Sequence, residues 1–463
     1  MKGLIYLIVI AIFTLVACDG ENLIPSSDYP ANQEMPENED SSEVPVNTDE
    51  DSISKVVLPY DEIPEEEYTI DLQYWDIPSD GTQPVKTTDN LQAAIDWAVG
   101  EGYGIIRLPA GHFIVGKDEN GAFHRGIKLK SNMAFFMDKD ALIEMVPNNK
   151  GNYYTVAVSE QRNVVISGGT ILGDRYDHTY TEGHTHGGGH CIAITHESEN
   201  VTVENMRLSE ATGDGILLQG YAGEGSSVKS IVIRENDIFD NRRQGISIVG
   251  GIDVLVEDNE IHHTHGTAPQ FGIDIESEIY HSENITIRNN YFHHNKGGHI
   301  INFDAWDLVI EDNIMEDGEG FDHWRSVIYW NNTAPIIRNN EITFNIPSKG
   351  VGIAMYPNKY SKTNPDTTLI SGNVLNGCGF YMYEGTDHKI IDNSITSGSI
   401  GLTDMRNVTL KDNYVEIDGS CGGMSLSNVR GIAFDNFLNG ILIHLPLDTE
   451  IPFDGRACEY KVE

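Results

Sequence analysis

Basic side chains are scarce in this sequence of 463 residues. It holds 30 Lys and Arg against 71 Asp and Glu, which gives a formal net charge of −41. Proteins that bind nucleic acid attract phosphates through a basic face, so this balance excludes a nucleic-acid partner. An acidic ligand would also be repelled unless cationic groups were concentrated at one place. We therefore expect any acidic partner to meet a local positive site.

Cysteine is also rare, and no apolar run is long enough to span a bilayer. Five cysteines are present. Four of them are spread without metal-type spacing and are interpreted as buried small hydrophobes or one incidental bridge: Cys191, Cys378, Cys421 and Cys458. The longest apolar stretch, residues 4–16, is shorter than a membrane-spanning helix requires. A disulfide framework and a transmembrane anchor of this kind are therefore excluded.

The first 18 residues are typical of a secretory signal. Lys2 precedes the apolar stretch, which ends in Leu-Val-Ala before Cys18. This ending resembles the bacterial lipobox, which implies cleavage before Cys18 and lipid modification of that residue. The acidic Asp19 and Glu21 resemble the export tag of surface lipoproteins. We expect a lipoprotein anchored in the outer membrane and exposed at the cell surface; the alternative is an ordinary signal with an incidental cysteine.

Residues 19–67 carry 16 acidic side chains against the single basic Lys55. Such a segment cannot bury enough apolar surface to order itself. The sequence predicts a disordered acidic tether over 19–67 and one folded catalytic domain over 68–463.

The folded part is predicted to begin with one amphipathic helix. Apolar residues recur at helical spacing behind Asp89, at Leu91, Ala94, Ile95, Ala98 and Val99. A short buried strand follows at residues 105–108. The helix would cover the first edge of a β region that follows.

That β region repeats one phrase. Two or three β-branched residues followed by a turn asparagine recur every 20 to 33 residues, at Asn205, Asn236, Asn259, Asn290, Asn313, Asn340, Asn373, Asn393, Asn413 and Asn436. A second phrase, Gly followed by alternating Ile, falls between them. This pattern predicts the coils of a parallel β-solenoid, in which equivalent asparagines stack and hydrogen-bond to one another. A β-sandwich, the alternative, has no reason to repeat one phrase.

The stretch from Asn90 to Gly111, with its helix and the strand IIRLPAGHFIVG, resembles the N-terminal cap of the pectate-lyase-like superfamily of right-handed β-helices. The resemblance implies an all-β fold, a single-stranded right-handed parallel β-helix with an N-terminal capping helix. That superfamily contains polysaccharide lyases, glycoside hydrolases, epimerases and phage tailspikes. The reaction must therefore be inferred from the site.

Asp274 and Glu276 form the most informative acidic pair. They stand at i and i+2 in the strand Gly-Ile-Asp-Ile-Glu, so both are predicted to point outward, roughly 7 Å apart. Such a pair can bind calcium through its oxygens or act as acid and base on a glycoside. The alternative is a solvated pair on an outer face.

Titratable and cationic residues gather on the same coils. Twelve of the 17 histidines fall between His178 and His299. Aligning the Gly-Ile strands places Arg243 one coil before Asp274, and Lys296 and His299 one coil after it, with His190 in the same register. We therefore predict one lateral groove as the site.

Elimination on a uronate requires a neutralised carboxylate and a base that reaches the C5 proton. Arg243, together with a cation on Asp274 and Glu276, would neutralise the carboxylate, and Lys296 or His299 would remove the proton. The substrate-binding side chains are predicted to be Arg242, His265, Trp324, Tyr329 and Trp330. A zinc site on His184, His186 and His190 is disfavoured because their spacing lies in a glycine loop.

The sequence thus predicts a polysaccharide lyase acting on a uronate-containing glycan, with glycosaminoglycans of the chondroitin or hyaluronan kind favoured over alginate and pectate. Two alternatives stay open. One is a glycoside hydrolase that uses Asp274 and Glu276. The other is a carbohydrate-binding solenoid without catalysis.

Overall fold

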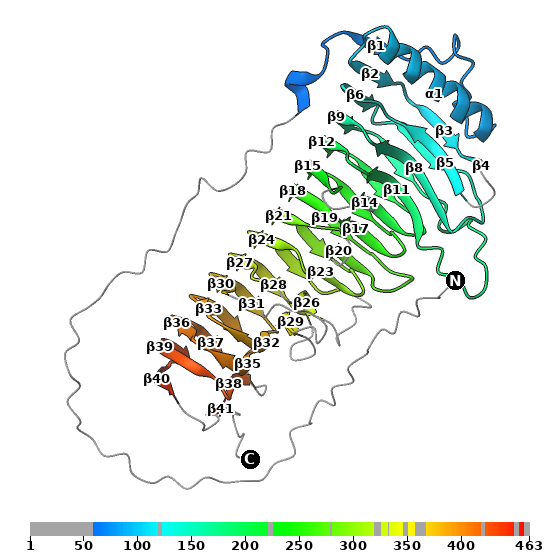
Figure 1. The fold of residues 1–463 in the computed structure, drawn as a ribbon. Helices are drawn as coiled ribbons and strands as arrows, with labels where there is room; N and C mark the ends of the chain where they lie inside the picture. Colours follow the sequence, from blue (N-terminus) through cyan, green and yellow to red (C-terminus); the bar gives the residue numbers. More distant parts are fainter. Residues whose placement is uncertain are drawn as a thin grey trace, which may run out of the picture. The chain divides into compact units, whose positions relative to one another are not determined.

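The predicted parallel β-helix is confirmed by a computed structural model (Figure 1). The structure describes residues 59–118, 123–220, 226–277, 280–318, 326–331, 333–345, 351–356, 367–417, 422–448 and 453–457. Each coil contributes up to three short strands, and equivalent strands of successive coils pair in parallel. Three ladders of strands result, which we number in the order in which a coil visits them.

The first and second ladders belong to one sheet. The first ladder consists of β1 (Glu67–Thr69), β2 (Ile105–Leu108), β6 (Met133–Met137), β9 (Arg162–Ser167), β12 (Glu199–Glu204), β15 (Val228–Arg234), β18 (Gly251–Glu257), β21 (Glu283–Arg288), β24 (Trp306–Glu311), β27 (Ile336–Arg338), β30 (Leu369–Ser371), β33 (Lys389–Ile391), β36 (Val408–Lys411) and β39 (Arg430–Leu438). The second consists of β3 (Gly111–Val115), β7 (Ala141–Met145), β10 (Thr170–Leu172), β13 (Arg207–Ser209), β16 (Asp237–Phe239), β19 (Glu260–His262), β22 (Tyr291–His293), β25 (Ile314–Glu316), β28 (Glu341–Thr343), β31 (Val374–Asn376), β34 (Ser394–Thr396) and β37 (Tyr414–Glu416).

The third ladder forms the second sheet and carries the predicted site. It consists of β5 (Phe123–Lys128), β8 (Asn152–Ser159), β11 (Gly188–Thr195), β14 (Asp214–Gln219), β17 (Gln244–Val249), β20 (Phe271–Glu276), β23 (Gly298–Phe303), β26 (Ser326–Asn331), β29 (Val351–Met355), β32 (Phe380–Thr386), β35 (Ser399–Arg406) and β38 (Gly422–Ser427). β4 (Lys117–Asp118), β40 (Ile441–Asp448) and β41 (Phe453–Ala457) pair antiparallel with β5, β39 and β38.

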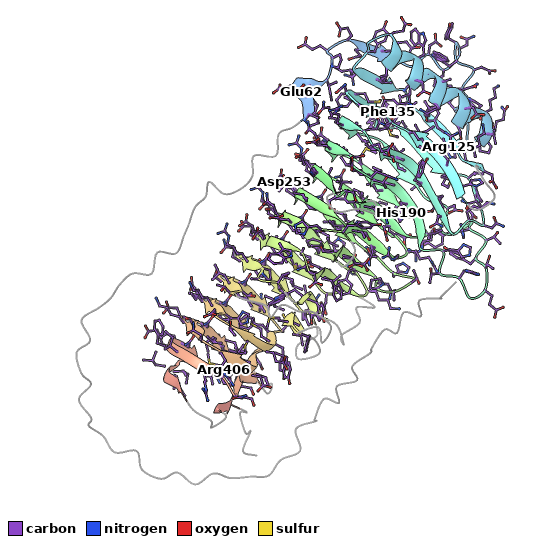
Figure 2. The ribbon with its side chains drawn as sticks, in the orientation of Figure 1. Glu62, Arg125, Phe135, His190, Asp253 and Arg406 are labelled. Carbon is purple, nitrogen blue, oxygen red and sulfur yellow. The ribbon has the colours of Figure 1, made fainter. Side chains whose placement is uncertain are left out.

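The core is a set of aliphatic columns along the inside of the solenoid, as the sequence pattern predicts. Figure 2 draws the side chains and labels Phe135, a member of this core. On the third ladder one column pairs residue by residue and is completely buried: Ile192, Ile216, Ile246, Ile273, Ile300 and Ile328. Because side chains alternate along a strand, the residue that follows each of these isoleucines points to the outer face.

The asparagine ladder is also confirmed, with one correction. Nine of the ten predicted asparagines form the ladder, in which each amide from Asn236 to Asn413 donates to the next carboxamide oxygen at 2.9–3.0 Å and Asn436 accepts the last of these bonds. Asn205 is not part of it, because it is exposed with a φ of 55°. The ladder position on its coil is Met206, whose N–H donates to Asn236.

The capping helix α1 (Pro84–Gly100) begins five residues before the predicted start. Pro84 fixes the first helical φ, so Asp89 lies inside the helix instead of capping it. The predicted apolar face is confirmed, since Leu91, Ala94, Ile95 and Ala98 are completely buried. The helix therefore covers the first coil as expected.

Ordered structure begins earlier than residue 68. The 3₁₀-helix Pro59–Glu62 contacts β9 and β12, and the Tyr60 hydroxyl donates to Glu204. Ile63 is buried against Ala134. The predicted tether boundary at residue 67 is therefore too late. The signal and Cys18 lie outside the described residues.

Two of the four remaining cysteines, Cys191 and Cys378, are buried free thiols in the core, as expected. Cys421 and Cys458 lie outside the described residues. Within the described ranges, no helix has the length and apolar character needed to cross a membrane.

Candidate functional site

A cluster of charged side chains lies on the outer face of the third ladder, across β11, β14, β17 and β20. Its centre is Arg243, which immediately precedes β17. Arg243 Nη1 lies 3.0 Å from Asp214 Oδ2, and Nη2 lies 3.7 Å from Glu276 Oε2. The Asp214 side chain is completely buried, whereas 41% of the Glu276 side chain is exposed. The guanidinium therefore connects a buried carboxyl of the preceding coil to an accessible one of the following coil. We call Arg243, Asp214, Asp274, Glu276 and His190 the Arg243 cluster.

Asp274 lies on the outer face by alternation, yet it is only 1% exposed, so it is not a solvated surface carboxylate. The Gln244 amide donates to Asp274 Oδ2, and Gln244 Oε1 accepts the Phe271 N–H at 2.8 Å. Burial raises the pKa of Asp274 well above its ordinary value, and the neighbouring Glu276 carboxylate adds to that rise. The raised pKa favours the protonated, uncharged form of Asp274.

Asp214 is the counter-ion of Arg243. Burial raises the pKa of Asp214 to about 6, and the Arg243 guanidinium limits the rise. In turn, the Asp214 carboxylate raises the pKa of Arg243. Above pH 6 the two groups are therefore an ion pair that fixes the guanidinium in place.

His190 contacts the same carboxyl from β11, with its Nδ1 3.4 Å from Asp214 Oδ2. Burial, followed by the charge of Arg243, lowers the pKa of His190 to about 3. The ring is therefore neutral at physiological pH and adds no charge to the cluster.

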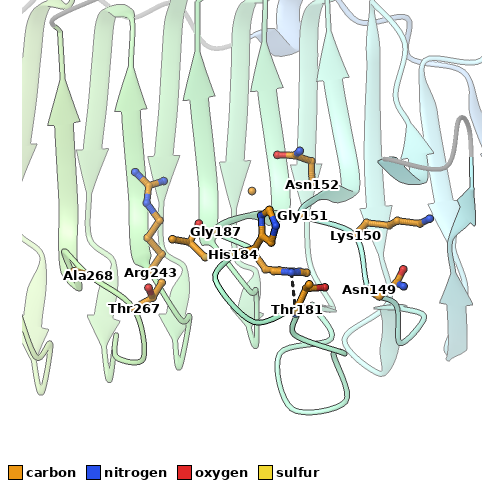
Figure 3. Close-up of a pocket in the computed structure, with 13 residues that line it drawn as sticks. Asn149, Lys150, Gly151, Asn152, Thr181, His184, Gly187, Arg243, Thr267 and Ala268 are labelled. Atoms are coloured by element: carbon orange, nitrogen blue, oxygen red, sulfur yellow. Dashed lines mark hydrogen bonds between the residues drawn. The ribbon is translucent and has the colours of Figure 1, made fainter. Parts of the chain in front are cut away.

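A pocket of about 700 Å³ opens beside Arg243 (Figure 3). Its lining comes from the β8 start, the loop before β11 and the loop before β20: Asn149, Lys150, Gly151, Asn152, Thr181, His184, Thr185, His186, Gly187, Gly188, Arg243, Thr267 and Ala268. Polar groups dominate this lining, which suits a hydroxyl-rich ligand.

A buried chain of hydrogen bonds holds the loop that forms one wall of this pocket. Thr181 N–H donates to His186 Nε2 at 3.1 Å, so His186 Nδ1 carries the proton and donates to His178 Nε2 at 2.8 Å. His178 Nδ1 then donates to Asp174 at 2.8 Å. Both ring nitrogens of His186 are thus hydrogen-bonded within this loop.

Two predicted site residues are wrong because they lie inside the solenoid. The His299 side chain is completely buried, and its Nε2 donates to the Glu316 carbonyl at 2.9 Å. It occupies the corner that Gly245 and Gly272 leave open on the preceding coils, where an added Cβ would meet core atoms. Trp330 is 1% exposed because it follows the inward Ile328 by two residues.

Other predicted residues lie around the cluster instead of in it. The Arg242 guanidinium donates to the Thr185 carbonyl at 2.6 Å and lies 4.5 Å from the Tyr180 ring centre. His265 pairs with Asp240 and Arg175, and the exposed Lys296 lies near His265. Trp324 lies outside the described residues.

Tyr329 belongs to an aromatic row on the outer face of the third ladder. Its ring centre lies 5.8 Å from Phe303, 5.9 Å from Tyr356, and Tyr356 lies 6.1 Å from Tyr381. Phe303 pairs in register with Glu276. The row therefore begins one coil after the Arg243 cluster and continues along the same face.

Asp214, Gln244 and Ser247 are absent from the predicted set of site residues. Asp214 and Gln244 pair in register at the starts of β14 and β17, and Ser247 pairs with Asp274. The sequence contained a sign of two of them. Asp214 and Gln244 are polar residues at the starts of strands whose other residues are mostly apolar and buried.

The family model described as "Right handed beta helix region" matches residues 124–266 and 223–374, which together span more than half of the chain. The chain belongs to the right-handed β-helix family. This agrees with the predicted pectate-lyase-like superfamily.

Among curated proteins, the uncharacterised protein YclG of Bacillus subtilis (strain 168) is 28% identical over 394 residues, which cover 73% of this chain and 65% of YclG. The chain thus spans slightly less than two thirds of the length of this relative.

Among solved structures, the A-module of the Azotobacter vinelandii mannuronan C-5 epimerase AlgE4 has a TM-score of 0.56 at 17% identity, covering 77% of this chain and 97% of the module. The Streptococcus pneumoniae surface protein and adhesin PfbA has a TM-score of 0.56 at 14% identity, covering 77% and 100%. These likenesses show the fold, which both an enzyme module and an adhesin use.

Proposed function

We propose that this chain is a polysaccharide lyase that cleaves a uronate-containing glycan by β-elimination. The observation that carries the proposal is the position of Arg243, fixed by a buried Asp214 on one side and directed toward the accessible Glu276 on the other, at the edge of an open polar pocket. In a chain of net charge −41, this is the local positive group that an acidic glycan requires.

The C5 proton of a uronate becomes acidic only when the charge of the C6 carboxylate is balanced. The forked Arg243 guanidinium would supply that balance, and the raised pKa of Asp274 favours an uncharged carboxyl beside the substrate. Glu276 replaces His299 as the proposed base, because it is the accessible carboxylate of the cluster. It removes the C5 proton, the electron pair forms the C4=C5 double bond, and the leaving O4 takes up the proton from Glu276.

The aromatic row from Phe303 to Tyr381 supports an extended sugar polymer as substrate. Its rings lie along the outer face from the coil next to Glu276, where they offer flat apolar surfaces to sugar rings. Glycosaminoglycans of the chondroitin or hyaluronan kind are the first substrates to test, followed by alginate and pectate.

The hydrolase alternative on Asp274 and Glu276 is less well supported. Glu276 is the accessible member of this pair, because Asp274 is only 1% exposed. Glycosidases instead place both carboxyl groups against the scissile glycosidic bond. The AlgE4 module is named as a C-5 epimerase, and epimerisation at C5 begins with the same proton abstraction, so it is the alternative closest to elimination.

Calcium stays a proposal as an additional cation. Asp274 and Glu276 alone offer fewer oxygens than the six to eight that calcium prefers, and the Arg243 guanidinium already lies beside Glu276. A calcium ion would therefore have to complete its shell with substrate carboxylate and water.

Anchoring through a lipid on Cys18 and exposure at the outer membrane are likewise proposals. Mass spectrometry of the mature N-terminus would test the lipid anchor.

The experiment is to incubate the purified protein with a panel of chondroitin, hyaluronan, alginate and pectate and to record the ultraviolet absorbance of the product. Elimination leaves a conjugated C4=C5 double bond, whereas hydrolysis, epimerisation and binding do not. Solvent deuterium at C5 without new absorbance would identify epimerisation instead. New reducing ends without absorbance would identify hydrolysis.

A further inference from the structure

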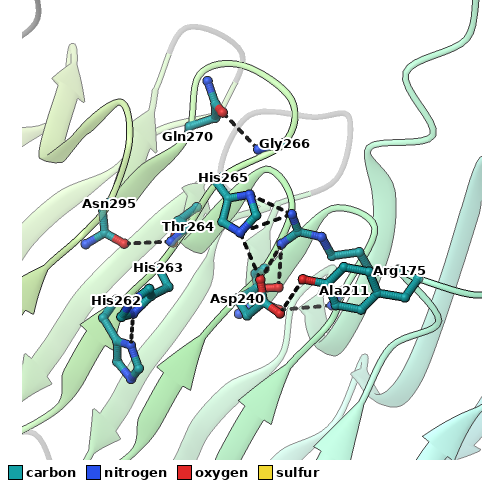
Figure 4. A network of polar contacts seen from close by, with 12 residues as sticks. Arg175, Ala211, Asp240, His262, His263, Thr264, His265, Gly266, Gln270 and Asn295 are labelled. Atoms are coloured by element: carbon teal, nitrogen blue, oxygen red, sulfur yellow. Dashed lines mark hydrogen bonds and ion pairs between the residues drawn. The ribbon is translucent and has the colours of Figure 1, made fainter. Parts of the chain in front are cut away.

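Four histidines form a second polar cluster on the second ladder, apart from the residues of the Arg243 cluster. His262 is the last residue of β19 and His263 follows it; His293 and His294 occupy the same positions at the end of β22 on the next coil. The His262 and His293 rings stack at 4.5 Å, and the His263 and His294 rings stack at 4.6 Å. We call these four residues the histidine ladder; Figure 4 shows its first pair beside Asp240 and His265.

Each inner ring of the ladder is oriented by a carboxylate from the preceding coil. His262 Nε2 lies 2.9 Å from Asp237 Oδ1, and His293 Nε2 lies 2.9 Å from Glu260 Oε1. A neutral imidazole must donate its Nε2 proton to such a carboxylate, which leaves its Nδ1 as a lone pair. The same carboxylate–imidazole arrangement orients histidines that bind metals.

Both of these Nδ1 atoms point at another imidazole. His262 Nδ1 lies 2.6 Å from His263 Nδ1, and His293 Nδ1 lies 2.8 Å from His294 Nδ1. Each contact brings together two ring nitrogens that can bind a metal, and one of the two must hold a proton for a hydrogen bond to form. A metal ion can take the place of that proton.

The ligand atoms also converge between coils. One ring nitrogen each of His262, His263 and His293 lies within 4.8 Å of the others. The inner rings are largely covered, with 16% and 11% of their side chains exposed, whereas His263 is exposed. The His263 imidazole is therefore open to an ion from solvent, while the inner imidazoles are held in place.

We propose that the histidine ladder binds a transition-metal ion of the zinc class, with His262, His263 and His293 as ligands and Asp237 and Glu260 as the carboxylates that orient them. Imidazole is a preferred ligand of zinc, copper and nickel, and hard cations such as calcium favour oxygen instead. Two nitrogens on one tetrahedral zinc lie about 3.4 Å apart, so binding opens the His262–His263 contact slightly. The ion joins two coils and stabilises the solenoid through its affinity for the folded state.

The test is calorimetric titration of the tag-free protein with zinc chloride, with thermal unfolding followed in parallel. His263→Asn removes the exposed ligand, and asparagine tolerates the left-handed φ of 55° at this position. His281→Ala is the matched control, because His281 is an exposed histidine that pairs with a carboxylate, Glu283, outside the ladder. Asp237→Asn keeps all ligands and removes only the orienting carboxylate.

We expect saturable zinc binding that raises the unfolding temperature of the unaltered chain and of His281→Ala. His263→Asn should weaken binding at least tenfold and remove the thermal shift. Asp237→Asn should weaken binding about 10- to 100-fold. Absence of saturable binding, or equal affinity in His263→Asn and His281→Ala, would overturn the proposal and leave the ladder as ring stacking between coils.

Discussion

The asparagine ladder and the Arg243 cluster are both columns of buried polar side chains that cross several coils, but they differ in how their groups are paired. Each asparagine from Asn236 to Asn413 donates its side-chain amide to the carboxamide oxygen of the next one along. In the cluster, in contrast, Asp214 pairs in register with Gln244, and Ser247 pairs with Asp274, so neighbouring coils carry different polar groups. A repeated residue stabilises the stack, whereas a polar residue that breaks the repeat is a candidate for function.

Hydrogen-bond satisfaction separates the same two columns. His190 Nδ1, Ser247 Oγ and Asp274 Oδ1 are buried atoms without a geometric hydrogen-bond partner, and none of the nine ladder asparagines has such an atom. A buried polar atom without a partner costs free energy of folding. A group that is unsatisfied in the free protein but can pair with a ligand is typical of a binding site.

Among substitutions in the two columns, we expect the largest loss of turnover at Glu276. Glu276→Gln should lower turnover about 10²- to 10⁴-fold, because it removes the proposed general base. Stability should hardly change, since 41% of the side chain is exposed. The matched control is Glu283→Gln, a similarly exposed carboxylate on the first ladder. Full activity in Glu276→Gln would exclude Glu276 as the base.

The largest effect on stability is expected at Asn290, in the middle of the asparagine ladder. Its side chain accepts the N–H and amide of Asn259 and donates to Val256, Arg288 and Asn313. Asn290→Ala should lower the free energy of unfolding by about 3 kcal/mol, because several buried groups lose their partners. Urea denaturation measures this.

The control for that substitution is Asn289→Gly, which alters an exposed neighbour with a φ of 55°. Its unfolding free energy should stay close to that of the unaltered chain. Activity per folded molecule should be the same in both variants. Loss of activity in folded Asn290→Ala would show that the ladder and the site are not separable.

A smaller effect is expected on the pH profile, through Asp214. As the pH falls through about 6, the pKa of Asp214, its carboxylate takes a proton and attracts Arg243 less strongly. We therefore expect kcat/KM to fall on the acid side with a midpoint near pH 6. Asp214→Asn should have lower activity that no longer changes over this range. A profile with the same acid limb in Asp214→Asn would assign that limb to another group.

The sign of the stability effect can be checked in the same samples. Folding raises the pKa of Asp214 from 3.8 to about 6, so the folded state binds the proton more tightly. This contribution to stability is present below pH 3.8 and is lost as the pH rises to about 6.

Removal of divalent cations should change turnover less than the substitutions in the Arg243 cluster. Arg243 already supplies a cation at the site, so treatment with a chelator should lower turnover less than tenfold. Calcium add-back measures the remaining dependence. A complete loss on chelation that calcium restores would make the ion, and not Arg243, the main neutralising group.

The fold could be predicted from the sequence because its information is repeated. Asn259, Asn290 and Asn313 each mark the same turn of successive coils. The wrong assignment of Asn205 therefore did not change the prediction of a solenoid. The Arg243 cluster could be predicted only in part, because each of its residues occurs once. His299 and Trp330 show the limit: strand alternation places Trp330 inside, but only the glycines of the neighbouring coils reveal the corner that His299 fills.

The most direct test of the catalytic role of the Arg243 cluster is to measure turnover and unfolding free energy on one preparation of Arg243→Ala. We predict at least a ~10²-fold loss of turnover, as for the loss of one preorganised electrostatic donor. Arg243→Lys should rescue only part of it, because a point charge lacks the fork. Arg243→Ala combined with Asp214→Asn should recover the stability lost with the ion pair, but not turnover. A destabilised Arg243→Ala that keeps full activity per folded molecule would contradict the account and make Arg243 a structural partner of Asp214.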